Sequence, residues 1–528
     1  MEGSGEEGSL AVLPLLGMLR IVRGRGPQAV LRATHAVRIP AISARRLATG
    51  PLDAMPLPCV DQHELRERQL LAARMKGVEP AESESAQPSG FGPEPAYQKV
   101  VSGYELYEHE APFALDYGGT LPSFQIAYET WGTLNEARDN VILVHTGLSA
   151  SSHAASTPKN PAKGWWEDFI GPGKALDTNR FFVICTNVLG SCYGSTGPSS
   201  PYPLDPNGEP YATRFPILSI FDMVRAQFLL LDHLGIDTLY ASIGSSMGGM
   251  QSIAAAHLFP NRVLRMASIS GTARCAPSGI ALRFSQRSVL MADPNWNRGF
   301  YYGPDQAPPH TGMKLARQIS TITYRSGPEW EQRFGRMRRT LNRDSTVSEA
   351  RIPALCPDFL VETYLDHQGE QFCLKYDANS LIYISKSMDL FDMSDDALAE
   401  LAETRLLAHG EDGSLPISPE DIAEEVQHNI EPRRRSGKHI STISNPGAHR
   451  YVPALARGLS RLRNVPVLII GVQSDILFPV EQQRELAECI RMNGNQSVMY
   501  YEMDAPHGHD SFLIDVANVG GAIKGFLY

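Results

Sequence analysis

The sequence predicts an α/β fold, a sheet of largely parallel strands covered by helices, and three observations support this prediction. Residues 465–472 form a short, continuously apolar run with the character of a buried parallel strand. A sharp turn at Ser246 joins a strand-like run to an alanine-rich helical run. Candidate aspartate and histidine residues then follow strand-like runs, at the strand ends where such sheets place their chemistry.

The first strands are expected soon after residue 105. Residues 123–131 alternate between apolar and polar side chains, which suits an early antiparallel strand. Residues 141–144 are short and continuously apolar, like a buried strand, and residues 181–187 suggest a further central strand. The early part of the chain therefore supplies one edge and part of the centre of the sheet.

The turn at Ser246 carries the pattern G-x-S-x-G between a strand and a helix. Residues 238–243 supply the strand and residues 251–258 supply the helix, so the pattern is typical of a nucleophile elbow. Gly244 and Gly248 lie two residues on either side of the serine, where a Cβ would collide with neighbouring backbone. The hydroxyl is then held outward at a helix N-terminus, which makes Ser246 the candidate nucleophile.

A serine nucleophile needs a histidine base and a carboxylate that orients the histidine. The strand-like run 465–472 leads to Asp475, the candidate acid, and the run 497–502 leads to His507 and His509. We predict that His509 is the base, because it precedes the final amphipathic helix, and that His507 makes local contacts. The order Ser, Asp, His along the chain indicates an α/β-hydrolase fold.

The oxyanion donors are predicted from the same fold. One donor is the amide of the residue after the nucleophile, Met247, and the other comes from the loop after the strand at 141–144. Leu148 is the candidate for the second donor, with Gly147 as the nearest alternative.

A change of pattern predicts an inserted lid. From residue 281 to residue 436 the chain has helical periodicity and many Arg, Glu and Gln residues. We expect a helical lid that keeps water away from the site. The expected boundaries are 105–280 for the first part of the core, 281–436 for the lid and 437–528 for the second part of the core.

The N-terminal segment has a different composition. No acidic residue occurs between Glu7 and Asp53, whereas arginines recur among alanines, leucines and valines. This composition predicts a mitochondrial transit peptide over residues 1–50, and thus a location in the matrix; a secretory signal and a disordered basic tail are the alternatives. Residues 51–104 are rich in Pro, Glu, Ser and Gln and predict a disordered linker.

The overall composition excludes several classes of function. The chain has 528 residues and a formal net charge of −10, without a basic stripe, which argues against a nucleic-acid partner. No apolar stretch approaches the roughly 20 residues of a membrane span. The seven cysteines include no C-x-x-C pair, so no metal site is expected. We therefore expect small-molecule substrates and no bound cofactor.

Several long motifs resemble the homoserine O-acetyltransferase family, over residues 105 to 528. They are the elbow and residues 164–178, 187–198, 474–479 and 508–513. The resemblance implies that acyl-CoA, as a co-substrate, acylates Ser246, with His509 as base and Asp475 as its orienting acid, and that an amino-acid hydroxyl collects the acyl group. It also implies that Arg317 binds the substrate carboxylate and Asp510 the substrate ammonium. A homodimer through the lid is a further expectation.

Two departures from the acetyltransferase pattern bear on the substrate. The loop at residues 145–153, HTGLSASSH, resembles the serine O-succinyltransferase branch of the same family. Arg283 stands where acetyl-specific members tend to have an uncharged residue, and it suits either the free carboxylate of a succinyl group or the phosphates of coenzyme A. The expected activity is succinyl transfer to serine, the activating step of cysteine synthesis. Homoserine O-acetyltransferase and serine hydrolase are the alternatives.

Overall fold

A computed structural model describes residues 65, 102–303, 306–339, 355, 357–409 and 451–528. All of them belong to one compact unit, Leu57–Tyr528. The predicted transit peptide, nearly all of the predicted linker and the C-terminal end of the predicted lid lie outside the described residues.

The core of the described chain is an eight-stranded mixed sheet in the order β1-β4-β8-β5-β9-β10-β11-β12. The six strands from β8 to β12 run parallel, whereas β4 is antiparallel to both β1 and β8. The strands are β1 (Glu105–His109), β4 (Phe124–Trp131), β5 (Val141–His145), β8 (Phe182–Thr186), β9 (Ala241–Ser245), β10 (Met266–Ile269), β11 (Val467–Val472) and β12 (Val498–Met503). Two small sheets pair β2 (Phe113–Ala114) with β3 (Thr120–Leu121) and β6 (Ile170–Gly171) with β7 (Leu176–Asp177).

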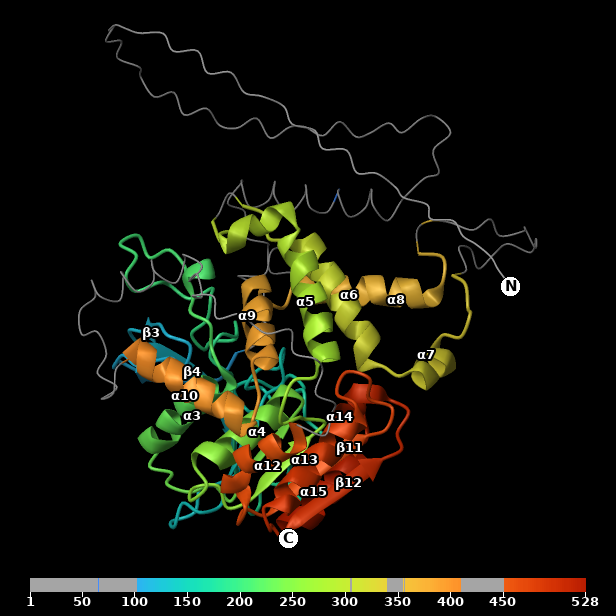
Figure 1. Ribbon diagram of the computed structural model, residues 1–528. Coiled ribbons are helices and arrows are strands. Elements are labelled where there is room, and N and C mark those ends of the chain that lie inside the picture. The colour runs from blue at the N-terminus through green and yellow to red at the C-terminus, as the bar shows by residue number, and fades with distance from the viewer. Residues whose placement is uncertain (1–64, 66–101, 304–305, 340–354, 356, 410–450) are drawn as a thin grey trace, which may run out of the picture. The chain divides into compact units, whose positions relative to one another are not determined.

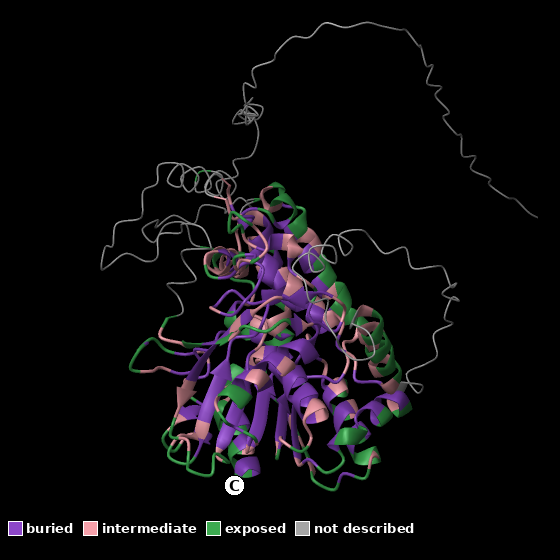
Figure 2. Cartoon of the chain, turned by 90° about the vertical axis from the view of Figure 1, so that its left-hand side faces the viewer, coloured by how far each residue is buried: buried purple, intermediate pink, exposed green. Residues whose placement is uncertain are grey.

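Both faces of the sheet are buried, which explains the continuous apolar runs of its central strands. Along β5, Leu143 faces one apolar cluster and its neighbours Ile142 and Val144 face another. The first cluster is completed by α3 (Ile220–His233), α4 (Met247–Leu258), α12 (Tyr451–Gly458) and α13 (Val480–Met492), and the second by α15 (Val516–Leu527). Figure 2 shows the strands buried along most of their length, with exposed residues mainly on the outer helices and loops.

Five helices that follow β10 lie above the core in Figure 1. They are α5 (Pro277–Met291), α6 (His310–Tyr324), α7 (Gly327–Arg333), α8 (Leu360–Cys373) and α9 (Ala378–Asp389). Helix α6 packs against both α5 and α8, and α5 also packs against α9. Proline at the first position of α5 suits a helix start, so the helical segment begins just before residue 281.

The next helix, α10 (Asp395–His409), packs against α12 of the core. Its Arg405 donates to the buried carboxylate of Asp116, at 2.7 Å from Nη2. This helix therefore returns the chain from the lid to the core. None of the helices in the described ranges has the length and hydropathy needed to cross a lipid bilayer.

Candidate active site

Ser246 lies in a strained turn between β9 and α4. Its φ of 58° and ψ of −123° are rarely adopted by a side-chain-bearing residue. A Cβ on Gly244 would lie 2.1 Å from the carbonyl oxygen of Gly248, and a Cβ on Gly248 would lie 2.3 Å from that of His145. The elbow therefore requires glycine at both positions, as the sequence predicted.

Three side chains form a hydrogen-bonded relay at the carboxyl ends of the strands. His509 Nε2 lies 2.8 Å from Ser246 Oγ, and His509 Nδ1 lies 2.6 Å from Asp475 Oδ2. The other oxygen of Asp475 accepts the backbone N–H groups of Leu477 and Phe478, both at 2.9 Å. The carboxylate is fixed in this way, so it can orient the imidazole and favour its protonated form.

The second histidine of the same segment lies outside the relay. His507 is partly exposed, and its Nδ1 lies 3.9 Å from a carboxylate oxygen of Glu329 on α7. It faces the lid, whereas His509 is buried between Phe478 and Phe512. The structure therefore places His509, and not His507, beside Ser246 and Asp475.

The loop after β5 lies beside the serine and is held from both sides. Gln251 of α4 donates to the carbonyl oxygen of Thr146 at 2.9 Å, and the hydroxyl of Tyr376 donates to that of Leu148 at 2.7 Å. Met247 is fully buried at the N-terminus of α4. Both predicted oxyanion donors, Met247 and Leu148, therefore belong to segments that adjoin Ser246.

The histidine at the start of this loop is a core residue. His145 is fully buried, with Nε2 2.8 Å from Ser242 Oγ. Burial lowers its pKa to about 3, because the charged imidazolium is poorly solvated there. It therefore stays neutral and supports the packing beneath the loop.

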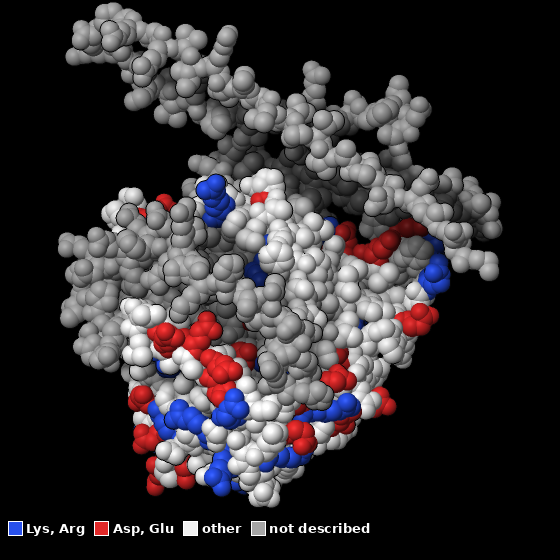
Figure 3. Space-filling model, viewed as in Figure 1, with Lys and Arg blue, Asp and Glu red and all other residues white. Residues whose placement is uncertain are grey.

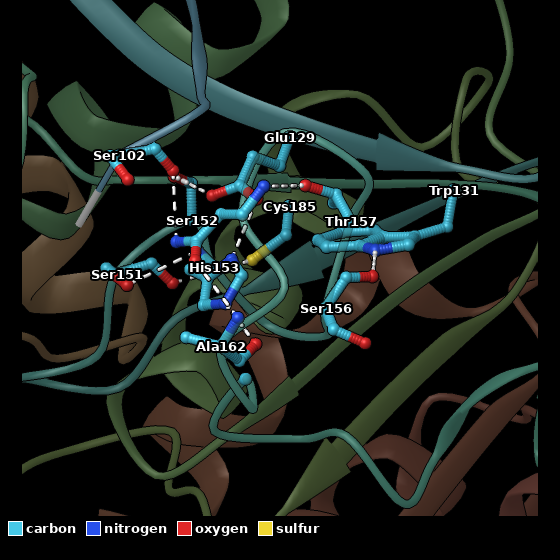
Figure 4. A network of polar contacts seen from close by, with 12 residues as sticks. Ser102, Glu129, Trp131, Ser151, Ser152, His153, Ser156, Thr157, Ala162 and Cys185 are labelled. Carbon is cyan, nitrogen blue, oxygen red and sulfur yellow. Dashed lines mark hydrogen bonds and ion pairs between the residues drawn. The ribbon is translucent and has the colours of Figure 1, made fainter.

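A buried polar network anchors the rest of this loop (Figure 4). The ring of His153 lies 2.9 Å from a carboxylate oxygen of Glu129 and 2.8 Å from the carbonyl oxygen of Ala162. These two contacts fix the orientation of the His153 ring. Ser152 Oγ donates to the second oxygen of Glu129 at 3.1 Å. The network ties the loop to β4, on the far side of β8 from β5.

A cavity of about 260 Å³ opens at the relay. Its walls come from the loop after β5, the elbow, the histidine segment and the lid. The lid contributes four cavity-lining residues with polar or charged groups, Arg283, Gln286, Arg317 and Tyr324, and Asp510 lines the cavity beside His509.

Arg317 of α6 forms no salt bridge within 4 Å in the described part of the chain, although its positive charge acts on Asp510 and opposes the rise that burial causes in the pKa of that carboxyl. Its guanidinium lies over the rings of Phe372, at 4.4 Å, and Tyr324, at 5.1 Å. Its Nε is buried and has no hydrogen-bond acceptor. Such a group at a cavity wall is ready to receive an anion.

Asp510 already has a partner within the protein. Arg325, between α6 and α7, lies 3.2 Å from Asp510 Oδ2 and also pairs with Glu329. Burial raises the pKa of Asp510, and the positive charge of Arg325 opposes that rise. A ligand ammonium at this carboxylate would therefore lie next to Arg325.

Arg283 belongs to a buried cluster of charges on α5 and α9. Its Nε donates to Asp389 at 2.6 Å, and Arg287 Nη2 donates to the other oxygen of the same carboxylate at 2.5 Å. A second nitrogen of Arg283 contacts the sulfur of Cys275. Burial raises the pKa of that thiol to about 11, so it stays neutral. Two guanidinium groups share one carboxylate, which leaves a net positive charge at the cavity wall.

Sequence reasoning assigned no role to three residues that contact the predicted site residues, namely Arg325, Arg287 and Asp389. Arg287 follows Arg283 by four residues and so shares its helix face, a spacing that the sequence does display. Asp389 and Arg325 are brought in by lid packing, for which the sequence gives no local signal. Among the described residues, no group of three or more His, Cys, Asp or Glu side chains is placed to hold a metal ion.

The parallel sheet, the strained elbow and the Ser-His-Asp relay define the class of protein. A family model for the alpha/beta hydrolase fold matches residues 140–516. Two solved structures share the architecture at 25% sequence identity. A homoserine O-acetyltransferase from Bacillus anthracis has a TM-score of 0.61 and covers 80% of this chain and 97% of its own. Esterase E22 has a TM-score of 0.60 and covers 81% and 100%.

A much nearer relative is known from its sequence. A serine O-succinyltransferase of Schizosaccharomyces pombe is 54% identical over 493 residues, which cover 90% of this chain and 94% of the relative. The chain belongs to the serine O-succinyltransferase family within the α/β-hydrolase fold. The match covers more of the chain than residues 105–528, so the similarity extends into the segment before residue 105 and is longer than the motifs indicated.

Proposed function

We propose that this protein transfers a succinyl group from succinyl-CoA to the hydroxyl of L-serine, through an acyl-Ser246 intermediate. The observation that carries the proposal is the relay of Ser246, His509 and Asp475 in a chain that is 54% identical to a serine O-succinyltransferase. The chemistry is assigned to protein side chains, with acyl-CoA as a co-substrate and no resident cofactor.

The first half-reaction acylates the serine. His509 Nε2 takes the proton of Ser246 Oγ while the oxygen attacks the thioester carbonyl carbon. The developing oxyanion is bound by the N–H groups of Met247 and Leu148. The C–S bond then breaks, and the thiol of coenzyme A leaves with the proton from His509.

The second half-reaction runs through the same groups in the opposite direction. The hydroxyl of the acceptor gives its proton to His509 and attacks the ester carbonyl carbon of acyl-Ser246. Ser246 leaves with the proton from His509, and O-succinylserine is released. Succinate is a better leaving group than hydroxide. A sulfur nucleophile can therefore replace the succinyloxy group of O-succinylserine, as cysteine synthesis requires.

The charges around the cavity suit a zwitterionic acceptor. Arg317 receives the α-carboxylate, because it lines the cavity and forms no salt bridge among the described residues. Asp510 receives the α-ammonium, in competition with Arg325. Both groups keep the acceptor oriented while its hydroxyl points at the acyl-enzyme.

Arg283 is assigned to the free carboxylate of the succinyl group. Its Nε is held by Asp389, and its Nη1 has no acceptor in the described part of the chain. A net positive charge on this wall favours a donor with a carboxylate tail over acetyl-CoA.

Two other activities are less favoured. The homoserine O-acetyltransferase of known structure is only 25% identical, against 54% for the serine O-succinyltransferase. Hydrolysis remains relevant because esterase E22 has the same fold. A lid that excludes water from the acyl-enzyme favours transfer over hydrolysis.

One experiment separates the three activities. The full chain is given acetyl-CoA or succinyl-CoA, with serine, homoserine or no acceptor, and both thiol release and product mass are measured. We expect O-succinylserine to form with the highest kcat/KM. Faster formation of O-acetylhomoserine, or equally fast thiol release without an acceptor, would contradict the proposal.

We also propose that a second copy of the chain covers the lid. Five large apolar side chains on α5 and α6 are between 38% and 61% exposed, namely Ile280, Phe284, Met291, Leu315 and Ile322. Figure 3 shows few charged side chains over these helices, whereas acidic and basic groups gather mainly over the lower half of this face. An uncharged apolar patch on two packed helices suits a self-complementary contact.

Light scattering should give a dimer for the wild type and a monomer for Phe284→Glu; a monomeric wild type would refute the contact.

The location is proposed from composition alone. Residues 1–50, which are rich in arginine and contain no acidic residue after Glu7, direct the protein to the mitochondrial matrix, where succinyl-CoA is produced. A fluorescent fusion of the full chain should enter mitochondria, and a fusion without residues 1–50 should remain in the cytosol. Identical distributions of the two fusions would refute the proposal.

A further inference from the structure

We propose that Tyr376 is a positioning residue for acyl transfer, because its hydroxyl holds the loop that carries Leu148. The inference rests on the proposed function, since it requires the N–H of Leu148 to bind the oxyanion. It concerns a residue of the lid, between α8 and α9, that does not line the cavity.

The hydrogen bond is built into a rigid environment. Tyr376 is fully buried, and its hydroxyl lies 2.7 Å from the carbonyl oxygen of Leu148. Its ring stacks on Phe372, with centroids 5.4 Å apart, and meets the edge of Tyr193 at 5.6 Å. Burial raises the pKa of the Tyr376 hydroxyl well above its usual value, so the group remains a donor at any pH at which the enzyme works.

The position of this bond in the loop explains its role. The carbonyl of Thr146 is fixed from the core by Gln251, and the carbonyl of Leu148 is fixed from the lid by Tyr376. Between the two lies Gly147, which has the conformational freedom of glycine. The peptide that carries the N–H of Leu148 is therefore held at both ends, and loss of either bond would let it rotate away from the oxyanion.

The same stack reaches a second cavity-lining residue, Arg317. Phe372 lies between Tyr376 on one side and the guanidinium of Arg317, 4.4 Å from the Phe372 ring, on another. The lid thus joins the group assigned to the acceptor carboxylate with the loop assigned to the oxyanion. A shift of α8 would move both.

The test is Tyr376→Phe, with Tyr383→Phe as its control. Both are lid tyrosines whose hydroxyl donates to a backbone carbonyl oxygen, at 2.7 Å for Tyr376 and 3.0 Å for Tyr383. The acceptor of Tyr383 is Thr213, outside the oxyanion loop, whereas that of Tyr376 is in the oxyanion loop. Each change removes one hydroxyl and keeps the ring.

We expect Tyr376→Phe to lower kcat for succinyl transfer by about 3- to 10-fold, the size of one net hydrogen bond, with KM for both substrates within about twofold of wild type. Tyr383→Phe should keep kcat within about twofold. The rate is expressed per active serine, titrated with a fluorophosphonate, so that an unfolded fraction does not contribute. The second-order rate of that labelling should fall in parallel, because it forms a similar oxyanion.

Two results would overturn the inference: an unchanged kcat in Tyr376→Phe, or an equal loss in both variants, which would indicate a general effect on lid packing. Failure of the proposed function is seen separately, as a wild type that makes no O-succinylserine. In that case the oxyanion role is judged on the fluorophosphonate labelling rates of the two variants alone.

Discussion

Arg325 and Asp510 form an ion pair of 3.2 Å that joins the lid to the residue next to His509. The contact is reinforced nearby, where the hydroxyl of Ser326 donates to the carbonyl of Pro506. Gly508 fits beneath the same lid segment, since a Cβ there would lie 2.9 Å from the carbonyl oxygen of Tyr324. The histidine segment is thus shaped by the lid as well as by the sheet.

This ion pair predicts a pH effect. Burial raises the pKa of Asp510 and Arg325 opposes that rise, so Arg325→Met should raise the pKa further. The ionised carboxylate, which binds the acceptor ammonium, would then be lost at a higher pH on acidification. The acidic limb of kcat/KM for L-serine should move to higher pH. Arg333→Met changes an exposed arginine of α7, so this control should leave the pH profile unchanged. If the acidic limb of Arg325→Met does not move, Asp510 does not bind the acceptor ammonium.

Removal of the serine hydroxyl tests the covalent intermediate. Ser246→Ala should abolish acyl transfer, and the wild type mixed with succinyl-CoA alone should carry one succinyl group on Ser246 by mass spectrometry. Ser245→Ala changes the neighbouring buried serine and serves as the control that still becomes acylated. Substantial transfer by Ser246→Ala would rule out the intermediate.

The carboxylate of the relay should matter for rate more than for folding. Asp475→Asn keeps the shape of the side chain but no longer accepts the Nδ1 proton of His509 as an anion, so kcat should fall by about 10⁴-fold. The melting temperature reports folding independently. A loss of less than tenfold in a folded variant would mean that another group orients His509.

Arg283 should discriminate between acyl donors. Arg283→Asn should lower kcat/KM for succinyl-CoA by about 10- to 100-fold, the size of a charge-assisted hydrogen bond, and leave acetyl-CoA nearly unaffected. Both donors are measured with the same protein preparation, so each serves as the control for the other. In the variant, Arg287 still donates to the carboxylate of Asp389. Equal losses for both donors would assign Arg283 to coenzyme A or to folding.

The elbow and the central strands were predictable because their signals are local. Gly244, Ser246 and Gly248 must adopt one geometry to make the turn, and the short apolar runs are typical of buried strands. The fold class is confirmed by the sheet and by the family match. The assigned roles of all the site residues remain predictions, as do the domain boundaries; these residues are Ser246, Asp475, His509, Met247, Leu148, Arg317, Asp510 and Arg283.

The surroundings of the charged residues were not predictable in the same way. Arg283 was selected for its charge, yet its counter-ion Asp389 lies on another helix and meets it only through lid packing. Arg325 appeared as one of many lid arginines, and nothing beside it in sequence points to Asp510. Contacts of this kind depend on how helices dock, which a hydrophobic pattern does not encode.

The lid is inserted between β10 and β11, and this has a consequence for the newly made chain. The elbow with Ser246 is synthesised before the lid, whereas His509 follows β12, the last strand. A ribosome-bound or C-terminally truncated chain therefore has a serine without its base. Such a chain should not consume acyl-CoA, so reactivity arises only when synthesis is complete and the last strand has docked.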